Sequence, residues 1–225
     1  MAMEQRHIRN IPALSEEDCR LLGQKTVTVV GCGGLGGYLV EQLARLGVGN
    51  IRCVDGDVFE ESNLNRQLLC TQALLGAGKA EAAAERIRAI DARIQAQAYP
   101  VFLEEANART LIAGCDAVLD ALDNVRSRKI LTKACTEENI PYIYGAVSGW
   151  TAQAAICMPA ENLLETLYPG DVQAEPAGVL SFTPALCASV QTALCVKWLT
   201  GRPVQSGVLH CWDLLGEDYA KMQIK

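Results

Sequence analysis

The residues best suited to chemistry are three glycines and an aspartate that follow two apolar runs. The run VTVV leads into Gly31, Gly33 and Gly36, which have the spacing G-x-G-x-x-G, and Asp55 ends a second run, IRCVD. Such glycines let the backbone approach a phosphate at the N-terminus of a helix. An acidic residue about 20 positions later is suited to hydrogen-bond a ribose. The sequence therefore predicts an adenine-nucleotide site and leaves both NAD and ATP open.

Polar and cationic side chains follow the second run. Segment 56–69, GDVFEESNLNRQLL, contributes Asn63, Arg66 and Gln67, and Lys79 follows in GAGKAEAA. These segments are expected at the carboxyl ends of parallel strands, where ligands of such sheets collect. Two cations there can neutralise phosphates during phosphoryl or nucleotidyl transfer. A dehydrogenase has little use for them, so the pair favours ATP.

A third polar segment, DALDN at 120–124, ends the next predicted strand. It brings Asp123 and Asn124 to the same edge of the sheet. A carboxylate there is suited to hold Mg²⁺ against a triphosphate, because Mg²⁺ prefers oxygen ligands. Both residues also suit the N-cap of the helix predicted next, which is the structural alternative.

The composition is that of one α/β domain spanning residues 1–225, with half of its residues hydrophobic. The net charge of −6 argues against nucleic acid as the main partner, since phosphate binding is chiefly electrostatic. No apolar run approaches the roughly 20 residues that cross a bilayer, so no membrane partner is expected. The N-terminal residues lack the apolar core of a signal peptide, and the expected location is the cytoplasm.

Strand-like and helix-like periodicities alternate along the chain. This alternation predicts a Rossmann-like, mostly parallel sheet with helices on both faces and antiparallel strands added at the C-terminal edge. Residues 1–24 are expected to form a helical arm and residues 159–182 a long crossing loop. The predicted strands are 27–31, 51–55, 94–102, 117–123, 141–147, 151–158, 207–215 and 221–224. The predicted helices are 37–49, 79–90, 106–114, 126–140 and 184–201.

The ten cysteines are scattered, and no two form a C-x-x-C pair. Several lie inside apolar runs, where a thiol behaves as a small hydrophobic side chain. Structural zinc sites use paired ligands, and disulfide scaffolds belong mainly to small secreted domains. Most of these residues are therefore expected in the core of a protein from a reducing compartment.

Seven segments in order carry a resemblance to a known family. They are RHIRN at 6–10, GCGGLG at 31–36, VDGD at 54–57, SNLNRQ at 62–67, GKAEAA at 78–83, DALDN at 120–124 and YIYGAV at 142–147. Together they resemble the ThiF/MoeB/HesA family of adenylating enzymes, relatives of the ubiquitin-activating enzymes. The resemblance implies an enzyme that binds ATP and Mg²⁺. It also implies that the enzyme adenylates the C-terminal glycine of a ubiquitin-like sulfur carrier ending in Gly-Gly, for thiamine or molybdopterin synthesis.

The resemblance also implies roles for individual residues. Asp123 would organise Mg²⁺ and be essential for catalysis, Asp55 would bind the ribose, and Asn63, Arg66 and Lys79 would hold the phosphates. The residues expected to bind the nucleotide are Gly31, Gly33, Gly34, Gly36, Asp55, Asp57, Asn63, Arg66, Gln67, Lys79, Asp123 and Asn124.

An arginine near the N-terminus implies a homodimer. Arg9 in RHIRN matches the arginine that dimers of this family insert into the neighbouring subunit's ATP site, and Arg6 is the alternative in that register. The resemblance therefore implies two composite sites per dimer, with Arg9 counted among the catalytic residues.

Two departures from the family pattern modify these expectations. Without C-x-x-C pairs, no structural zinc is expected. Ala174 occupies the crossing-loop position where some members carry a reactive cysteine, so the enzyme is expected to stop at the acyl-adenylate. Cys187 is the nearest other thiol, but its apolar helix favours a buried structural role. The functional alternatives are an NAD-dependent oxidoreductase and a tRNA-modifying or scaffold relative of the same fold.

Overall fold

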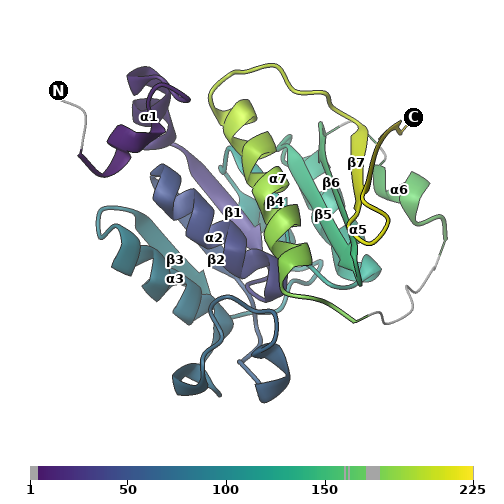
Figure 1. Cartoon of the computed structure of the whole chain (residues 1–225), viewed down its shortest axis with the longest axis horizontal. Helices are drawn as coiled ribbons and strands as arrows, with labels where there is room; N and C mark the ends of the chain where they lie inside the picture. The colour runs from purple at the N-terminus through teal and green to yellow at the C-terminus, as the bar shows by residue number, and fades with distance from the viewer. Residues whose placement is uncertain (1–4, 160, 162, 171–177, 225) are drawn as a thin grey trace.

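The computed structural model describes residues 5–159, 161, 163–170 and 178–224 (Figure 1). In this part of the chain, eight strands form one sheet with the order β3-β2-β1-β4-β5-β6-β7-β8. The strands are β1 (Thr26–Val30), β2 (Asn50–Val54), β3 (Gln95–Tyr99), β4 (Ala117–Asp120), β5 (Tyr142–Ser148), β6 (Thr151–Cys157), β7 (Val208–Asp213) and β8 (Asp218–Gln223).

The strand directions confirm the predicted fold class. Strands β1 to β5 run parallel to one another. The pairs β5–β6, β6–β7 and β7–β8 are antiparallel. The chain winds outward from β1 to β3 and then returns to place β4 on the other side of β1. Ligands of open α/β sheets bind at such a reversal, beyond the carboxyl ends of the strands. Here that point lies between Val30 of β1 and Asp120 of β4, which are paired.

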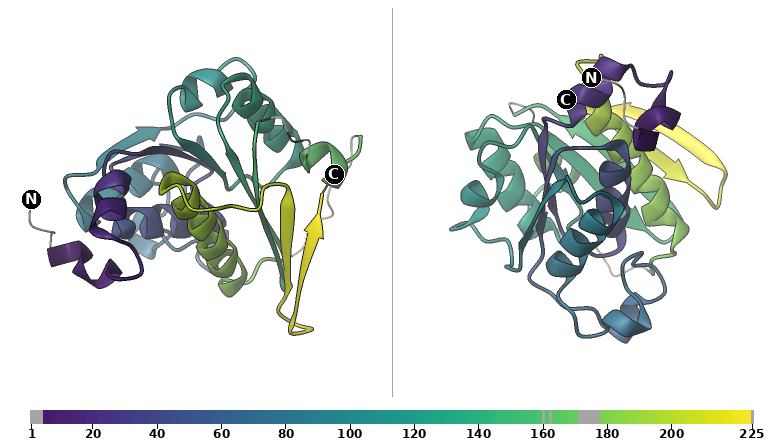
Figure 2. Two further views of the ribbon diagram at one scale, coloured as in Figure 1. Left: turned by 90° about the horizontal axis from the view of Figure 1, so that it is seen from above. Right: turned by 90° about the vertical axis from the view of Figure 1, so that its left-hand side faces the viewer.

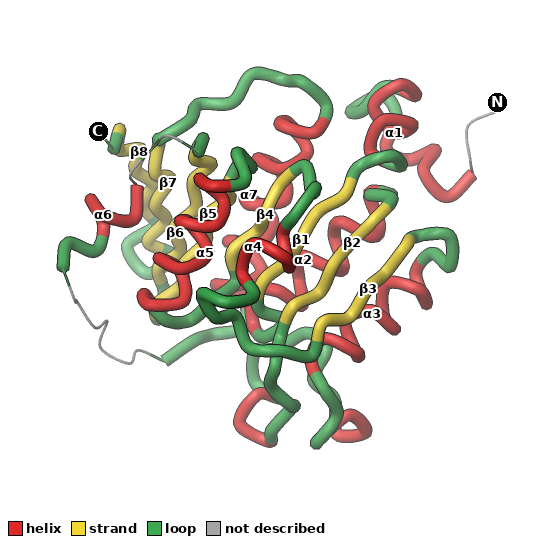
Figure 3. The backbone as a smooth tube through the Cα atoms, turned by 180° about the vertical axis from the view of Figure 1, so that it is seen from behind, coloured by secondary structure: helices red, strands yellow, loops and turns green. Residues whose placement is uncertain are grey.

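Helices cover both faces of the sheet. Figure 1 shows α2, α3 and α7 in front of it, and Figure 3, seen from behind, shows α4, α5 and α6 on the opposite face. The α-helices are α1 (Glu16–Leu22), α2 (Gly34–Leu46), α3 (Lys79–Ile90), α4 (Ala108–Ile112), α5 (Val125–Glu137), α6 (Leu163–Leu167) and α7 (Phe182–Leu199). Short 3₁₀ helices are η1 (Gln5–Asn10), η2 (Glu61–Asn63) and η3 (Gln72–Leu74).

Two apolar cores lie on the two faces of the sheet. Leu39 and Leu43 of α2 and Cys187 of α7 pack with Val29 of β1 on one face. Leu131 of α5 packs with other buried side chains on the opposite face. The central strands are buried on both faces, which is why their sequences read as continuous apolar runs. Among the described residues, no helix is long and apolar enough to span a membrane.

The β7–β8 hairpin extends the sheet beyond its helical layers (Figure 2). Every residue of β8 is exposed, and Trp212 of β7 stacks on Tyr219 of β8 with ring centroids 5.1 Å apart. Cross-strand aromatic pairs of this kind stabilise antiparallel ribbons. Side-chain stacking therefore adds to the backbone pairing of β7 with β8 in stabilising the hairpin. Pairing of β7 with β6 attaches the hairpin to the rest of the sheet.

The structure corrects several expected boundaries: the predicted strands 94–102 and 221–224, for example, are Gln95–Tyr99 and Asp218–Gln223. Two further corrections concern the predicted strand 117–123 and the crossing loop. The predicted strand 117–123 ends at Asp120, the last residue of β4 that is paired with β1, because Ala121 and the residues after it turn toward α5. The predicted crossing loop contains the short helix α6, whose Leu163 and Leu164 are buried against the core on the α5 face. Residues 160, 162 and 171–177 of that loop, including Ala174, lie outside the described residues.

Candidate active site

The glycine turn joins the end of β1 to the start of α2. Gly31 has a φ of +94°, which side chains rarely adopt, and a Cβ there would lie 2.5 Å from the carbonyl oxygen of Ala121. A Cβ on Gly36 would lie 1.9 Å from the carbonyl oxygen of Gly31. The absence of both side chains lets the α2 N-terminus and segment 121–124 approach the turn. A helix N-terminus is suited to bind an anion, because its first backbone N–H groups lack partners within the helix.

Asp55 is tied to this turn by its carboxylate. One oxygen accepts a hydrogen bond from the backbone N–H of Cys32 (2.7 Å) and the other from that of Asp57 (2.9 Å). Burial raises the pKa of Asp55 above its usual value, although both hydrogen bonds oppose the shift. A carboxylate has about four acceptor positions, so two remain for further donors.

Arg66 and Gln67 lie against the glycine turn. A Cβ on Gly34 would lie 3.7 Å from Cγ of Arg66, and a Cβ on Gly33 would lie 3.4 Å from Nε2 of Gln67. The side chain of Gln67 is buried, and its Oε1 has no hydrogen-bond partner among the described residues. Buried polar atoms are normally paired, so this oxygen marks a place where a donor from a ligand or water fits.

Asn63 has a local structural role instead. Its Oδ1 accepts from the backbone N–H of Glu60 (3.1 Å), and its Nδ2 donates to Oγ of Ser62 (3.3 Å). These bonds fix the start of η2, which leads to Arg66. The backbone carbonyl oxygen of Asn63 accepts from the N–H of Arg66 (3.2 Å). The sequence did not indicate that the side chain of Asn63 is already engaged.

Lys79 is nearly buried at the start of α3 and forms an ion pair with Asp57. Its Nζ lies 2.5 Å from Oδ2 of Asp57, whose side chain is half exposed. The hydrogen bond from Lys79 lowers the pKa of Asp57. The structure thus joins Asp55, Asp57 and Lys79 in one group beside the glycine turn.

Asp123 and Asn124 are exposed between β4 and α5. Oδ1 of Asn124 accepts from the backbone N–H of Ser127 (2.8 Å), which makes Asn124 the N-cap of α5. Its Nδ2 donates to Oδ1 of Asp123 (3.2 Å). Of the two residues that suited the cap, Asn124 therefore takes it, and Asp123 keeps most of its acceptor capacity free for other donors.

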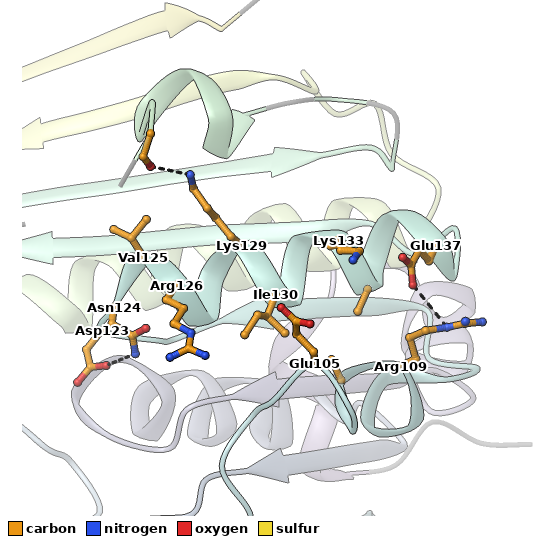
Figure 4. Close-up of a pocket in the computed structure, with 13 residues that line it drawn as sticks. Glu105, Arg109, Asp123, Asn124, Val125, Arg126, Lys129, Ile130, Lys133 and Glu137 are labelled. Atoms are coloured by element: carbon orange, nitrogen blue, oxygen red, sulfur yellow. Dashed lines mark hydrogen bonds and ion pairs between the residues drawn. The ribbon is translucent and has the colours of Figure 1, made fainter. Parts of the chain in front are cut away.

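A cavity of about 860 Å³ begins at Asp123 and follows α5 (Figure 4). Asp123 and Asn124 lie at one end, and Arg109 with Glu137 lies at the other. Arg126, Lys129 and Lys133 of α5 give this wall a positive character. The glycine turn, Arg66 and Lys79 do not line this cavity, so only Asp123 and Asn124 belong both to it and to the predicted site.

The two candidate N-terminal arginines lie far from the glycine turn. A Cβ on Gly47, the C-cap of α2, would lie 2.7 Å from His7, so η1 packs at the end of α2 opposite its glycine-rich start. The 13 residues of α2 separate these ends by about 20 Å. Arg9 is exposed, whereas Arg6 forms an ion pair with Asp91 at 2.8 Å.

Sequence reasoning missed a buried polar group beside Asp123. Asp120, Arg128, Tyr142 and Gln191 are all buried where β4 ends. Asp120 is the first residue of the DALDN segment. An acidic residue at the end of an apolar strand could have indicated a buried ion pair there. Nothing in the sequence indicated that Gln191, 71 residues later, contacts Asp120.

Sequence comparison then identifies the family. Residues 4–225 match the ThiF family. The chain belongs to this family. A match over nearly the whole chain confirms the resemblance seen in the seven motifs.

Several ThiF-family relatives are similar over most of this chain. The sulfur carrier protein adenylyltransferase of Thermus thermophilus is 31% identical over 229 residues, covering 96% of this chain and 84% of that protein. The SAMP-activating enzyme E1 of Haloferax volcanii is 34% identical over 200 residues, covering 86% of this chain and 74% of that protein. A probable adenylyltransferase/sulfurtransferase MoeZ of Mycobacterium tuberculosis is 32% identical over 228 residues, covering 96% of this chain but 58% of that longer protein.

Solved structures support the ThiF-family fold. E. coli MccB with MccA-N7isoASN has a TM-score of 0.88 at 18% identity, covering 100% of this chain and 72% of that one. PaaA has a TM-score of 0.79 at 24% identity, covering 92% of this chain and 66% of that one. At these identities the likeness concerns the fold alone.

The thiols of this ThiF-family chain behave as core residues, as predicted. All ten lie in the described part of the chain and are free, and eight are buried. Burial raises the pKa of Cys187 to about 12, so its thiolate is scarce at neutral pH. In the described residues no group of three or more His, Cys, Asp or Glu side chains could hold a metal ion. The expectation that zinc is absent stays a prediction.

We expect Cys187→Ala to keep adenylation within about threefold of wild type, because a buried neutral thiol is a poor nucleophile. Loss of the buried sulfur is expected to lower the free energy of unfolding by about 1–2 kcal/mol. ATP–pyrophosphate exchange and thermal melting measure the two effects, and Cys19→Ala, at a half-buried thiol, is the control. Complete loss of exchange in a folded Cys187→Ala protein would contradict the structural role.

Proposed function

We propose that this chain uses ATP to adenylate the C-terminal glycine of a ubiquitin-like sulfur-carrier protein. The observation that carries the proposal is the packing of two cationic segments around the glycine turn: Arg66 lies against Gly34, and Lys79 is buried beside Asp57. The names of its ThiF-family relatives, including a probable molybdopterin-synthase adenylyltransferase of Porphyra purpurea that is 30% identical over 223 residues, support the same reaction.

The site suits ATP on chemical grounds. The α2 N-terminus and backbone at Gly31, Gly33, Gly34 and Gly36 would face phosphate oxygens, which accept hydrogen bonds from backbone N–H groups. Asp55 would bind ribose hydroxyls with its remaining acceptor positions. A triphosphate would give Lys79 a second partner in competition with Asp57. Asn63 would support Arg66 through η2.

We propose that Asp123 holds Mg²⁺, with Asn124 restraining the carboxylate from one side. Bound Mg²⁺ supplies charge neutralisation for the phosphates and the departing pyrophosphate. One protein carboxylate with nucleotide oxygens is an ordinary ligand set for this ion. Asp123 is exposed and has no cationic partner among the described residues, so its charge is available to a metal.

The reaction needs no general base, because the terminal carboxylate of the carrier is already ionised at neutral pH. A carboxylate oxygen forms a bond to the α-phosphorus of ATP, and the bond from that phosphorus to pyrophosphate breaks. The products are an acyl-adenylate and pyrophosphate. The enzyme's residues supply orientation and charge neutralisation, as in other phosphoryl-group transfers. We propose that the acyl-adenylate passes to another protein in thiamine or molybdopterin synthesis.

We further propose a cytoplasmic homodimer. The free thiols suit a reducing compartment. Arg9 is exposed in η1, which packs at the end of α2 opposite the glycine turn, and so would serve a site in a second subunit rather than its own. Arg6 is engaged by Asp91, which favours Arg9 in this role.

Mixing two inactive variants tests the composite site. We expect Arg9→Ala and Asp123→Ala each to abolish most exchange alone. After subunit exchange of an equal mixture, we expect recovery of about one quarter of wild-type activity, because half of the dimers then contain one intact site. Activity measured against time of mixing checks this. No recovery in a mixture shown to contain heterodimers would place Arg9 outside the partner's site.

ATP–pyrophosphate exchange tests the proposed function itself. Labelled pyrophosphate should enter ATP only with Mg²⁺ and a carrier protein ending in Gly-Gly, and a carrier lacking its last glycine should be inactive. The carrier that supports exchange is the substrate. Absence of exchange with every carrier, together with tight NAD binding, would instead support an oxidoreductase. Dimerisation without ATP turnover would support a scaffold.

A further inference from the structure

Hydrogen bonding between β4 and β5 stops just before the segment that carries Asp123. The paired residues are Val118 with Tyr142 and Leu119 with Ile143. Beyond Leu119 the chain leaves this ladder and reaches Asp123 within four residues. Buried backbone groups at such a point need other hydrogen-bond partners. Side chains from both helical layers provide them here.

Arg128 is the partner on the α5 side. Its guanidinium donates to Oδ2 of Asp120 (3.0 Å), to the carbonyl oxygen of Gly145 (2.8 Å) and to the carbonyl oxygen of Leu122. Oδ1 of Asp120 accepts from the backbone N–H of Leu122 (2.8 Å). The Asp120–Arg128 pair therefore holds both backbone polar groups of Leu122, the residue immediately before Asp123.

Gln191 is the partner on the α7 side. Its Nε2 donates to the carbonyl oxygens of Asp120 (2.8 Å) and Ile143 (3.0 Å). A Cβ on Gly145 would lie 2.3 Å from Cδ of Gln191, so a glycine is needed there to admit the amide. The end of β4 is thus fixed from both faces of the sheet.

We propose that Arg128, assisted by Gln191, is a positioning residue that sets the direction in which Asp123 leaves the sheet. This inference rests on the proposed function, in which Asp123 holds Mg²⁺. Stability alone does not require the pair, because apolar residues often replace a buried ion pair without loss of stability. The planar guanidinium, 5.0 Å from the ring centroid of Tyr144, makes three directed contacts that a lysine ammonium cannot reproduce.

The test compares Arg128→Lys with wild type in ATP–pyrophosphate exchange. We expect kcat to fall about 10- to 100-fold and the Mg²⁺ concentration for half-maximal exchange to rise, with the KM for ATP changed less than about threefold. In an Asp123→Glu background the same substitution should slow exchange less than about twofold, because Arg128 acts through residue 123.

Leu131→Val is the matched control, since Leu131 of the same helix is buried in the apolar core and has no polar side-chain group that could hydrogen-bond to segment 120–124. It should melt at a lower temperature and keep kcat and the Mg²⁺ requirement of wild type. Equal changes of kcat and of the Mg²⁺ requirement in Arg128→Lys and Leu131→Val would show that Arg128 contributes only to packing. An unchanged Mg²⁺ requirement in Arg128→Lys would show the same.

Hydrogen exchange followed by mass spectrometry separates this inference from the proposed function. In Arg128→Lys, peptides containing the Leu122 amide should exchange at least about tenfold faster than in wild type, while peptides from β1 stay unchanged. This readout needs no activity. If wild-type protein fails to exchange pyrophosphate with any carrier, the proposed function is wrong. If the Leu122 amide stays protected, the positioning role is wrong.

Discussion

Asp123→Ala is expected to lower kcat for ATP–pyrophosphate exchange by about a thousandfold, since one preorganised electrostatic contact is commonly worth that much. The expected melting temperature is close to that of wild type, because Asp123 is exposed and, within the described part of the chain, its only side-chain hydrogen bond joins the neighbouring Asn124. Size-exclusion chromatography should show the same oligomeric state as wild type. Exchange kinetics and melting curves together separate loss of metal binding from loss of structure.

Glu105→Ala is a matched control for that experiment. Glu105 lies on the segment before α4 and lines the same cavity as Asp123, which the glycine turn does not line. Its removal should change kcat less than about threefold, as for a surface charge outside the reacting centre. Wild-type exchange in Asp123→Ala would remove this residue from the mechanism. A large loss in Glu105→Ala would show that the whole cavity serves the reaction.

Gly36→Ala is expected to produce the largest loss of stability among single substitutions near the site. The new Cβ would lie 1.9 Å from the carbonyl oxygen of Gly31, so α2 must move away from the end of β1. Overpacking between buried backbones costs about 3 kcal/mol, which corresponds to a fall of roughly 6–12 °C in melting temperature for a chain of this size. Thermal and urea unfolding measure the change.

Gly34→Ala controls for the effect of adding a methyl group to the same helix. Its Cβ would meet Cγ, Cδ and Nε of the flexible Arg66 side chain at 3.7, 3.9 and 4.0 Å, which are ordinary contact distances. Alanine is the better helix former by about 1 kcal/mol, so stability should stay equal or rise. If both the Gly36→Ala and the Gly34→Ala proteins melt at the wild-type temperature, the close approach of α2 to Gly31 does not constrain the fold.

The main features of the fold followed from local patterns in the sequence. Apolar runs such as 27–30 predicted central strands, because residues buried on both faces of a parallel sheet leave no polar alternation. The crossing loop was less predictable. Leu163 and Leu164 form helix α6 because they dock against the α5 face, and that contact depends on tertiary packing rather than on local periodicity.

Part of the candidate site was equally predictable. Spacing alone indicated that Gly31 and Gly36 form a tight turn against a helix, and the turn conformation confirms it, since Gly31 has a φ of +94°. Order along the chain also brought Arg66 and Lys79 to that edge of the sheet. It did not distinguish Asn63, which caps η2, from Gln67, which keeps an unpaired buried oxygen.

The sequence by itself determined the glycine turn, the order of strands and helices, and the family, because each depends on residue types at short, fixed spacings. Tertiary structure decided which polar groups are occupied and which are free. Lys79 pairs with Asp57, and Gln191 reaches the carbonyl oxygen of Asp120 from 71 residues away. Such contacts arise when helices pack over the ends of the strands. Local sequence carries no signal for them, because their energy comes from satisfying buried polar groups that only folding brings together.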